Sequence, residues 1–381
     1  MMNNQLNEII QSRGGLFWLE GEHNPSTIEI FETITSIFNS YTTFTEKELY
    51  KDKPRKIVYG ILNGSTLNAL AYASPSSDET PFDFIGINVG TIFTLLDVFG
   101  RILSHPDNFP EIGNASLEDA KRAYVPYLST DIISSHNSLC FPNCPVRSIY
   151  SSNLATTALT FLFFHEITHL RNGHLEFIKE NTSYIFWQEA LSSNHKEVDP
   201  LILQTLEMDA DCGAVLATLN KAFNLMKQAS FPKKQVEPGM LDALKNSHGD
   251  GEAATKTVVF SIYTMFRLFD LSDWDILNQH KYSHPQPPIR MSWIASTICT
   301  IFHQRPAYNY AAEKFIKDAS NTIIEAEQAC GKIKNMAPDT RGILSVFTTN
   351  LHVEYSERLN EIWRTIRPQL EIHKRGGNLA E

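Results

Sequence analysis

Cysteine is scarce in this chain of 381 residues, which argues against a fold held together by disulfides. The cysteines are odd in number and scattered, so we expect reduced thiols. Only Cys140 and Cys144 lie close together, at a spacing that could serve a metal. No second Cys or His pair with finger-like spacing follows them, and two free thiols in a Pro-rich loop is the favoured interpretation. The full set is Cys140, Cys144, Cys212, Cys299 and Cys330.

Long apolar runs are also missing. Residues 85–103 contain Asp97 and Arg101, and residues 258–271 form a short stretch that contains Arg267. A membrane span needs ~20 consecutive apolar residues, which neither stretch supplies. We therefore predict no transmembrane helix.

Basic residues are in the minority, and the formal net charge is −10 at pH 7. Binding to nucleic acid or to anionic lipid depends on clustered Lys and Arg, so general affinity for either is not expected. Residues 1–5 lack a basic start followed by an apolar core, which predicts no secretory signal and a cytoplasmic location. At 42% hydrophobic residues, the chain can fill the core of one large globular unit or two modest ones.

Apolar, β-compatible segments are confined to the N-terminal part of the chain. Residues 56–63, 66–73 and 83–89 are separated by Asn-Gly and Pro-Ser-Ser turn signals, and we interpret them as strands of a small sheet. From Gly90 the pattern becomes mainly helical, with a loop-rich region at 104–151. The predicted fold class is α+β, mainly α.

Two of the predicted helices have start signals. The first begins at Asn153 as N-cap, is apolar almost all round, and ends near Asn172-Gly173. The second has Asp199 as N-cap and Pro200 at its first position, and it runs to about Leu219. Further helices are expected at 253–271, 289–303, 311–333 and 344–367, and the tail after Gly376 is expected to be loose.

The segment His165-Glu166-Ile167-Thr168-His169 carries the main functional signal. Histidines at i and i+4 lie one turn apart on one helix face, so both imidazoles can reach one metal ion. Glu166 lies roughly 100° around the helix and can reach a water molecule bound to that metal. The pattern arises by chance in roughly a few per cent of such chains. Its place in a buried helix strengthens it, because buried His and Glu are costly without partners.

A catalytic zinc needs a third protein ligand, and the second helix offers one. Glu207 and Asp211 lie at i and i+4 on that helix. Glu207 is the candidate ligand, and Asp211 is a candidate acceptor for the free ring nitrogen of a ligating histidine. Ala210, Gly213 and Ala214 are small enough for two helices to approach closely. The alternative is that Glu207, Asp209 and Asp211 form an exposed acidic face.

The order of these motifs resembles the gluzincin metallopeptidases, in particular their HtpX-type branch. H-E-x-x-H is followed by E-x-x-A-D-x-x-A from Glu207, and then by His284-Pro285 with Arg290 six residues after the histidine. The resemblance implies a zinc cofactor and a protein or peptide substrate. It also implies that His284 helps to hold the tetrahedral intermediate and that Arg290 braces the acidic residues around the metal. A Pro-rich turn with an ordinary surface histidine is the alternative for this motif.

Two weaker likenesses add expectations. The HtpX-type branch often has an upstream Asn-Ala strand against which the substrate lies as an added strand, and Asn68-Ala69 matches it in position. Gly173-His174 after H-E-x-x-H resembles the Lit-type phage-exclusion peptidases, which implies a bacterial defence or regulatory protease. His174 could serve as a substitute ligand, but a helix-end histidine interacting with terminal carbonyls is the favoured interpretation.

These resemblances cover about a third of the chain and imply a zincin-like core. The expected parts are an N-terminal part with the sheet and the cleft strand at 1–110, a zincin-like helical catalytic part at 111–303, and a C-terminal helical extension at 304–381. The chain lacks the membrane helices of HtpX-type enzymes, and the helices expected from residue 311 onward take no part in the resemblance.

The predicted function is hydrolysis of peptide bonds by a zinc endopeptidase. Zinc would be held by His165, His169 and Glu207, with Glu166 as general base. A zinc-binding sensor or inactive relative is the first rival. The second is a helical interaction protein whose His and Glu residues are ordinary core and surface groups. The sequence does not predict the substrate's identity or the oligomeric state.

Overall fold

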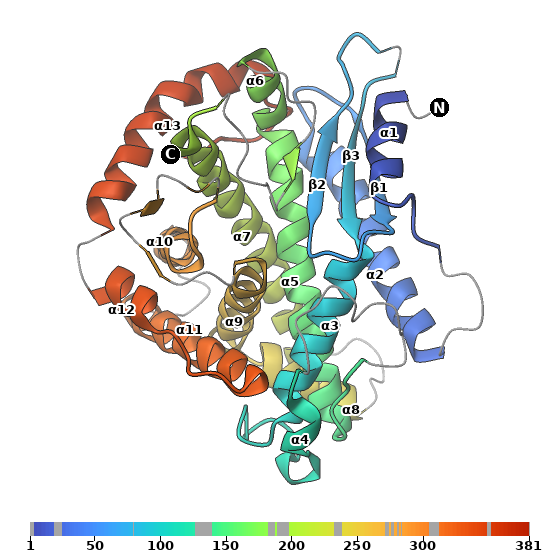
Figure 1. Ribbon diagram of the computed structural model, residues 1–381, viewed down its shortest axis with the longest axis vertical. Helices are drawn as coiled ribbons and strands as arrows, with labels where there is room; N and C mark the ends of the chain where they lie inside the picture. Colours follow the sequence, from blue (N-terminus) through green and yellow to red (C-terminus); the bar gives the residue numbers. More distant parts are fainter. Residues whose placement is uncertain are drawn as a thin grey trace.

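The computed structural model describes residues 4–18, 25–78, 80–125, 139–181, 187–188, 198–231, 238–270, 274–275, 278–279, 282, 284–304, 312–348 and 352–380. In these ranges the chain is mainly helical and contains one four-stranded sheet (Figure 1). The predicted α+β, mainly α class is therefore confirmed. The predicted helix ends at Leu271 and Ala311 lie outside the described residues, as do Met1, Met2 and Asn3.

The sheet has the strand order β1-β3-β2-β4. β1 runs parallel to β3, whereas β2 is antiparallel to both of its neighbours. The three predicted strands are confirmed, although the second begins at Ala69. The strands are β1 (Lys56–Leu62), β2 (Ala69–Ala73), β3 (Phe82–Asn88) and β4 (Trp187–Gln188).

Side-chain alternation along β2 explains how the sheet is covered on both faces. Leu70 and Tyr72 face a small apolar cluster with helix α1 (Asn4–Ser12). Ala69, Ala71 and Ala73 belong instead to the main core, on the face where the sheet meets helix α5. Because alanine is small, α5 can lie close to the sheet.

Helix α5 (Pro145–Arg171) is central, and it is buried along most of its length. It packs against α3 (Val89–Ser104), α7 (Pro200–Ser230), α8 (Pro238–His248) and α9 (Gly251–Phe269). The predicted start at Asn153 is wrong, as is the loop assigned up to Ser151. Pro145 occupies the first turn, where a missing N–H costs nothing, and Ser151 and Ser152 hydroxyls donate to the Ser148 carbonyl within the helix.

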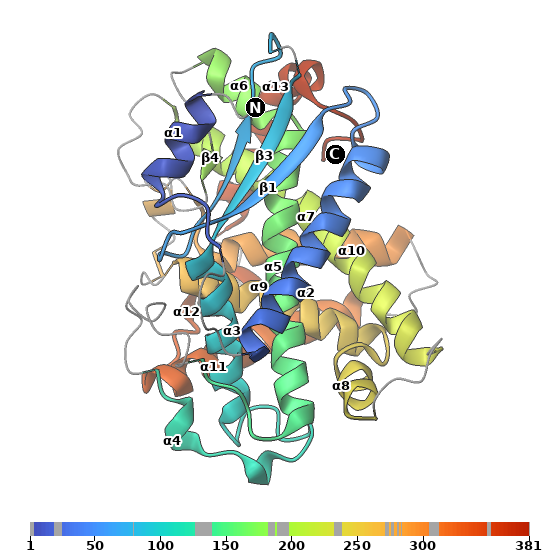
Figure 2. The same cartoon turned by 90° about the vertical axis from the view of Figure 1, so that its right-hand side faces the viewer.

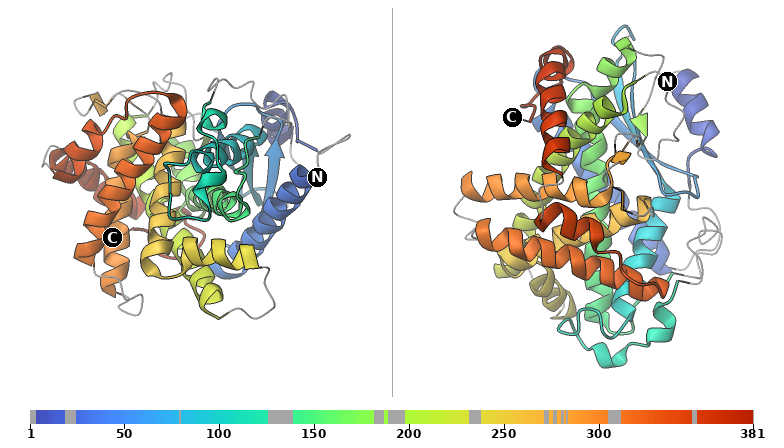
Figure 3. Two further views of the ribbon diagram at one scale, coloured as in Figure 1. Left: turned by 90° about the horizontal axis from the view of Figure 1, so that it is seen from below. Right: turned by 60° about the vertical axis from the view of Figure 1, so that its left-hand side comes forward.

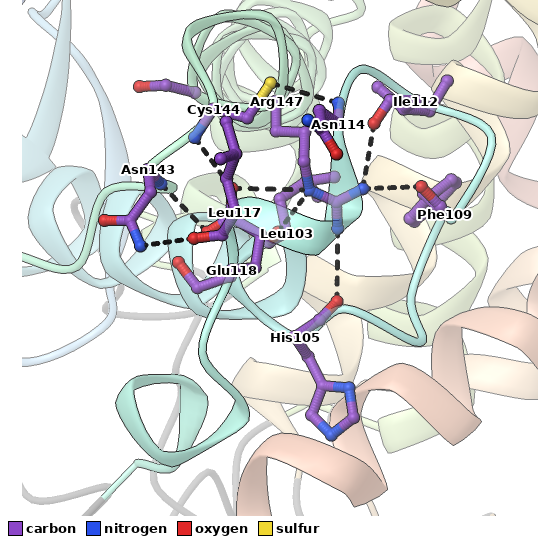
Figure 4. A network of polar contacts seen from close by, with 12 residues as sticks. Leu103, His105, Phe109, Ile112, Asn114, Leu117, Glu118, Asn143, Cys144 and Arg147 are labelled. Carbon is purple, nitrogen blue, oxygen red and sulfur yellow. Dashed lines mark hydrogen bonds and ion pairs between the residues drawn. The ribbon is translucent and has the colours of Figure 1, made fainter.

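Arg147, near the start of α5, is buried and holds the segment that follows α3 (Figure 4). Its guanidinium donates to five backbone carbonyls at 2.7–3.2 Å and lies 3.7 Å from the Glu118 carboxylate. A buried guanidinium needs such partners to offset lost hydration. The N-terminal end of α5 is thereby fixed. The accepting carbonyls are those of Leu103, His105, Asn108, Phe109 and Ile112.

The C-terminal helices gather on the side of α5 away from the sheet (Figures 1 and 3). On the sheet side, α2 crosses obliquely beside β1 (Figure 2). The helix predicted at 344–367 is wrong, because the structure has α12 and α13 there. Helix α7 also continues beyond the predicted end at Leu219. The remaining helices are α2 (Pro25–Phe44), α4 (Ala120–Ala123), α6 (His174–Asn181), α10 (Pro287–Gln304), α11 (Ala312–Lys334), α12 (Arg341–Thr348) and α13 (Val353–His373).

The tail after α13 is docked, so the prediction of a loose tail after Gly376 is wrong. Arg375 is buried, and its guanidinium lies 2.6 Å from both Asp83 of β3 and Glu176 of α6. Leu379 is only 2% exposed and belongs to the main core. One core cluster thus includes residues from Phe31 to Leu379 and crosses the predicted boundaries after residues 110 and 303. The division of the chain into three parts stays a prediction.

Among the described residues, no helix has the length and apolar character needed to cross a membrane.

Candidate metal centre

His165 and His169 lie one turn apart near the end of α5, as predicted. Their Nε2 atoms are 3.0 Å apart, and both residues are fully buried. Burial lowers the pKa of His169 to about 3, an effect that outweighs the opposing hydrogen bond with Glu207. The imidazole is therefore neutral at physiological pH, which is the form that binds a metal.

Glu207 of α7 completes a buried three-residue group with the two histidines. Its carboxylate oxygens lie 3.4 Å from His165 Nε2 and 3.4 Å from His169 Nε2. Tetrahedral ligands bound to zinc at its usual bond lengths are separated by roughly 3.3–3.5 Å. The two His–Glu separations fall in this range, and the 3.0 Å between the two Nε2 atoms is slightly shorter. Two imidazoles and a carboxylate are ligands that zinc accepts, so the residues present fit a zinc ion.

Close contact between α5 and α7 brings these ligands together. Ala210 and Ala214 are fully buried, and a Cβ placed on Gly213 would come within 2.6 Å of the Thr168 side chain. The small residues predicted to allow this approach are thus at the helix contact.

Asp211 lies behind His165, on the side away from the ligand group. Its Oδ1 is 3.0 Å from His165 Nδ1, the ring nitrogen that does not face Glu207, so the carboxylate can orient this imidazole. Arg290 donates to both Asp211 oxygens, at 2.9 and 2.7 Å, and its Nη2 also lies 3.3 Å from Glu207. The structure therefore brings Asp211, Arg290 and Glu207 together.

His284 approaches the same group from the segment before α10. Its Nε2 lies 3.3 Å from Glu207 Oε1, and its side chain is 17% exposed, whereas Glu207 is fully buried. Burial raises the pKa of Glu207, but the charges of His284 and His165 and hydrogen bonds from the histidines hold it well below its ordinary value. Glu207 is therefore a carboxylate. Ser283, which precedes His284, lies outside the described residues.

Three glutamines hold the segment that carries His284, and no sequence motif singled them out. Gln286 N donates to Gln279 Oε1 at 3.0 Å, and Gln204 of α7 donates to the Gln279 carbonyl at 2.7 Å. Tyr355 of α13 donates to Gln204 at 2.6 Å. The His284 segment is thereby tied to the helix that carries Glu207.

Glu166 directly follows His165 in α5 and is fully buried. A buried carboxylate between two histidines is costly in a helix that is otherwise apolar. Its position next to the ligand group suits a base that acts on a water molecule there.

His174 was predicted to contact terminal carbonyls, and this is wrong. Its Nδ1 lies 2.9 Å from His169 Nδ1, and its Nε2 lies 3.0 Å from Asp209 Oδ2. Gly173, with a positive φ of 79°, ends α5 in the left-handed conformation that glycine favours. Asp209 is buried rather than part of an exposed acidic face.

Ala69 is the first residue of β2, the strand predicted to receive a substrate, and Asn68 directly precedes it. Asn68 is buried, and its backbone N–H donates to Thr91 Oγ1 at 2.8 Å. Beyond Ala69, the side of β2 away from β3 is paired with β4, opposite Leu70 and Ala71. An added strand would have to displace β4 at those two residues, and the substrate role of Asn68 and Ala69 stays a prediction.

The five cysteines form no disulfide, as predicted. Cys140 and Cys144 are both buried, and Cys144 Sγ accepts a hydrogen bond from the Asn114 backbone N–H at 3.2 Å. They belong to the core near α5 rather than to the ligand group.

No family model, curated protein or solved structure matches this chain. The chemistry of the site is therefore the basis for assigning a function.

Proposed function

We propose that this protein is a zinc-dependent endopeptidase with a zincin-like core, similar to the gluzincins of the HtpX-type branch. The observation that carries the proposal is the convergence of His165, His169 and Glu207, whose ligand atoms lie 3.0–3.4 Å apart, close to the separations of tetrahedral zinc ligands. Two histidines and one carboxylate leave a ligand position open, which is typical of catalytic rather than structural zinc.

A zinc ion bound there would lower the pKa of a water molecule and polarise a substrate carbonyl. Glu166 takes a proton from the water molecule while the water oxygen forms a bond to the substrate carbonyl carbon. Glu166 then passes that proton to the leaving amine as the C–N bond breaks. His284 donates a hydrogen bond to the developing oxyanion. Arg290 holds Asp211, which in turn orients His165.

A zinc-binding sensor without hydrolytic activity is the first alternative. A structural zinc generally has four protein ligands, and the buried Glu166 beside the ligands favours hydrolysis over this role. The second alternative is an interaction protein without a metal. If the purified protein contains no metal and a chelator leaves its stability unchanged, this second alternative is correct.

Substitution of Glu166 by Gln separates hydrolysis from metal binding. Gln keeps the size of the side chain but cannot accept the proton, so Glu166→Gln should retain zinc and lose nearly all cleavage. Wild type and variant are incubated with a cell lysate, and new N-termini are mapped by mass spectrometry. New termini produced by wild type alone support the proposal and identify the substrate. A fully active variant, or zinc-loaded wild type that produces no new termini, contradicts it.

A further inference from the structure

A run of polar contacts connects His169 with the C-terminal end of the chain. His169 Nδ1 contacts His174 Nδ1 at 2.9 Å, and His174 Nε2 contacts Asp209 Oδ2 at 3.0 Å. The other oxygen of Asp209 accepts a hydrogen bond from the backbone N–H of Ala380 at 3.0 Å. His169, His174 and Asp209 are all buried.

The partners fix where the protons lie in this run. Asp209 Oδ2 accepts a hydrogen bond from the side-chain amide of Asn172, and Oδ1 accepts one from the Ala380 N–H, so the carboxylate is also the acceptor in its contact with His174. His174 then carries its proton on Nε2, and its Nδ1 accepts. In the metal-bound form His169 would consequently donate through Nδ1, and the lone pair of its Nε2 would be available to the ion.

The tail itself is held on several sides. Arg375 N donates to the Arg171 carbonyl at the end of α5, at 2.6 Å. Trp363 of α13 donates to the Ala380 carbonyl at 3.1 Å. Leu379 is buried between these anchors, and Figure 1 places the C-terminal end near α7 and α13. The Ala380 N–H is therefore directed at Asp209 by a fixed backbone.

We propose that His174, Asp209 and the C-terminal tail position the metal ligand His169. His165 contacts the Asp211 carboxylate directly. His169 reaches the Asp209 carboxylate only through His174, and the Ala380 N–H near the chain end donates to that same carboxylate. The tail is thus part of the metal centre. This inference rests on the metal site of the proposed function but does not require hydrolysis.

Zinc affinity, measured by competition with a chromophoric chelator, tests these roles. Loss of a hydrogen-bond partner of a metal-bound histidine lowers metal affinity by about 10–100-fold. We expect a decrease in zinc affinity of about this size for His174→Phe and Asp209→Asn. Ala380→Pro removes only one backbone donor, so a smaller loss is expected. Ala380→Ser keeps that donor and should bind zinc like wild type. The cobalt-loaded forms should show altered visible absorption in the three weakened variants.

Unfolding of the metal-free proteins separates positioning from general stability. Ala380→Pro and Ala380→Ser should unfold alike without metal, while only Ala380→Pro loses affinity and changes the cobalt spectrum. Wild-type affinity and spectrum in Ala380→Pro and Asp209→Asn would overturn the inference, even if the protein cleaves peptides. Weakened zinc binding in a protein that cleaves nothing would support it and refute the peptidase. Absence of zinc binding by wild type would overturn both.

Discussion

Arg290 is the residue on which the acidic side of the metal centre depends most directly. Arg290 is 4% exposed, and its guanidinium contacts both Asp211 and Glu207 and lies over the Phe266 ring at 3.9 Å. Two buried carboxylates side by side would repel each other without a cation. Arg290 therefore stabilises the fold as well as the ligand arrangement.

Replacement of this cation should destabilise the protein strongly. Arg290→Met leaves buried carboxylates without their charge partner, so the free energy of unfolding should fall by about 3–5 kcal/mol in a denaturant titration. Arg341→Met is the matched control, because exposed Arg341 pairs with Asp339 at the surface and should cost less than about 1 kcal/mol. Equal losses in the two variants would contradict the assigned role of Arg290.

His248 predicts a pH dependence away from the metal centre. Burial, aided by the charge of Lys221, lowers the pKa of His248 from 6.5 to about 4. Between these values the unfolded chain binds a proton that the folded chain does not, so stability falls as the pH decreases from 6.5 towards 4. The loss attributable to His248 is about 3 kcal/mol.

His248→Leu should remove this component. In chelator, so that zinc does not contribute, wild type should lose about 3 kcal/mol more than the variant between pH 7 and pH 4. The measurement is the free energy of unfolding at each pH, and other titrating groups cancel in the difference. Parallel pH profiles for the two proteins would show that His248 is not held neutral by the fold.

At the scale of elements, the site depends on the distance between α5 and α7. The two histidines of the proposed zinc site lie on α5 and Glu207 lies on α7, so a change in helix separation changes the distances between these side chains. Gly213 faces Thr168 at the contact. Thr168 is β-branched, and its hydroxyl donates to the Phe164 carbonyl at 2.7 Å, which restricts its movement.

Gly213→Ala should therefore separate the helices. Ala ordinarily stabilises a helix interior by about 1 kcal/mol relative to Gly. Here, overpacking of about 1–3 kcal/mol should exceed that gain and should also weaken zinc binding. Gly239→Ala in α8 is the control, since an added Cβ there meets nothing within 4 Å. Chemical denaturation measures the loss of stability, and zinc competition measures the loss of zinc affinity. A Gly213→Ala protein as stable as the Gly239→Ala control would refute the predicted overpacking.

Local signals in the sequence predicted some element boundaries and missed others. Asp199 and Pro200 identified the start of α7, where the Asp199 carboxylate accepts from the Leu201 N–H at 2.9 Å. Cys144 provides no side-chain cap for α5, so Pro145 resembled part of a loop. Packing of α5 against its neighbours, which no local pattern records, extends the helix to that point.

At the scale of the whole molecule, the spacing within each motif predicted which site residues meet. His165, His169, Glu207, Asp211, His284 and Arg290 converge although they lie on three separate segments. Asp209 and the chain end were missed, because a carboxylate near two others resembles an exposed face, and the docking of the tail depends on the tertiary fold. Long-range contacts of this kind leave no local signal.

Metal analysis of the purified chain tests the central claim most directly. Wild type, purified without chelator, should contain about one zinc per chain, and Glu207→Ala should contain clearly less, because two histidines alone hold zinc weakly. Equal zinc content in the two proteins would remove Glu207 from the ligand set. Wild type that contains no zinc, takes up none and keeps its stability in chelator would contradict the metal centre itself.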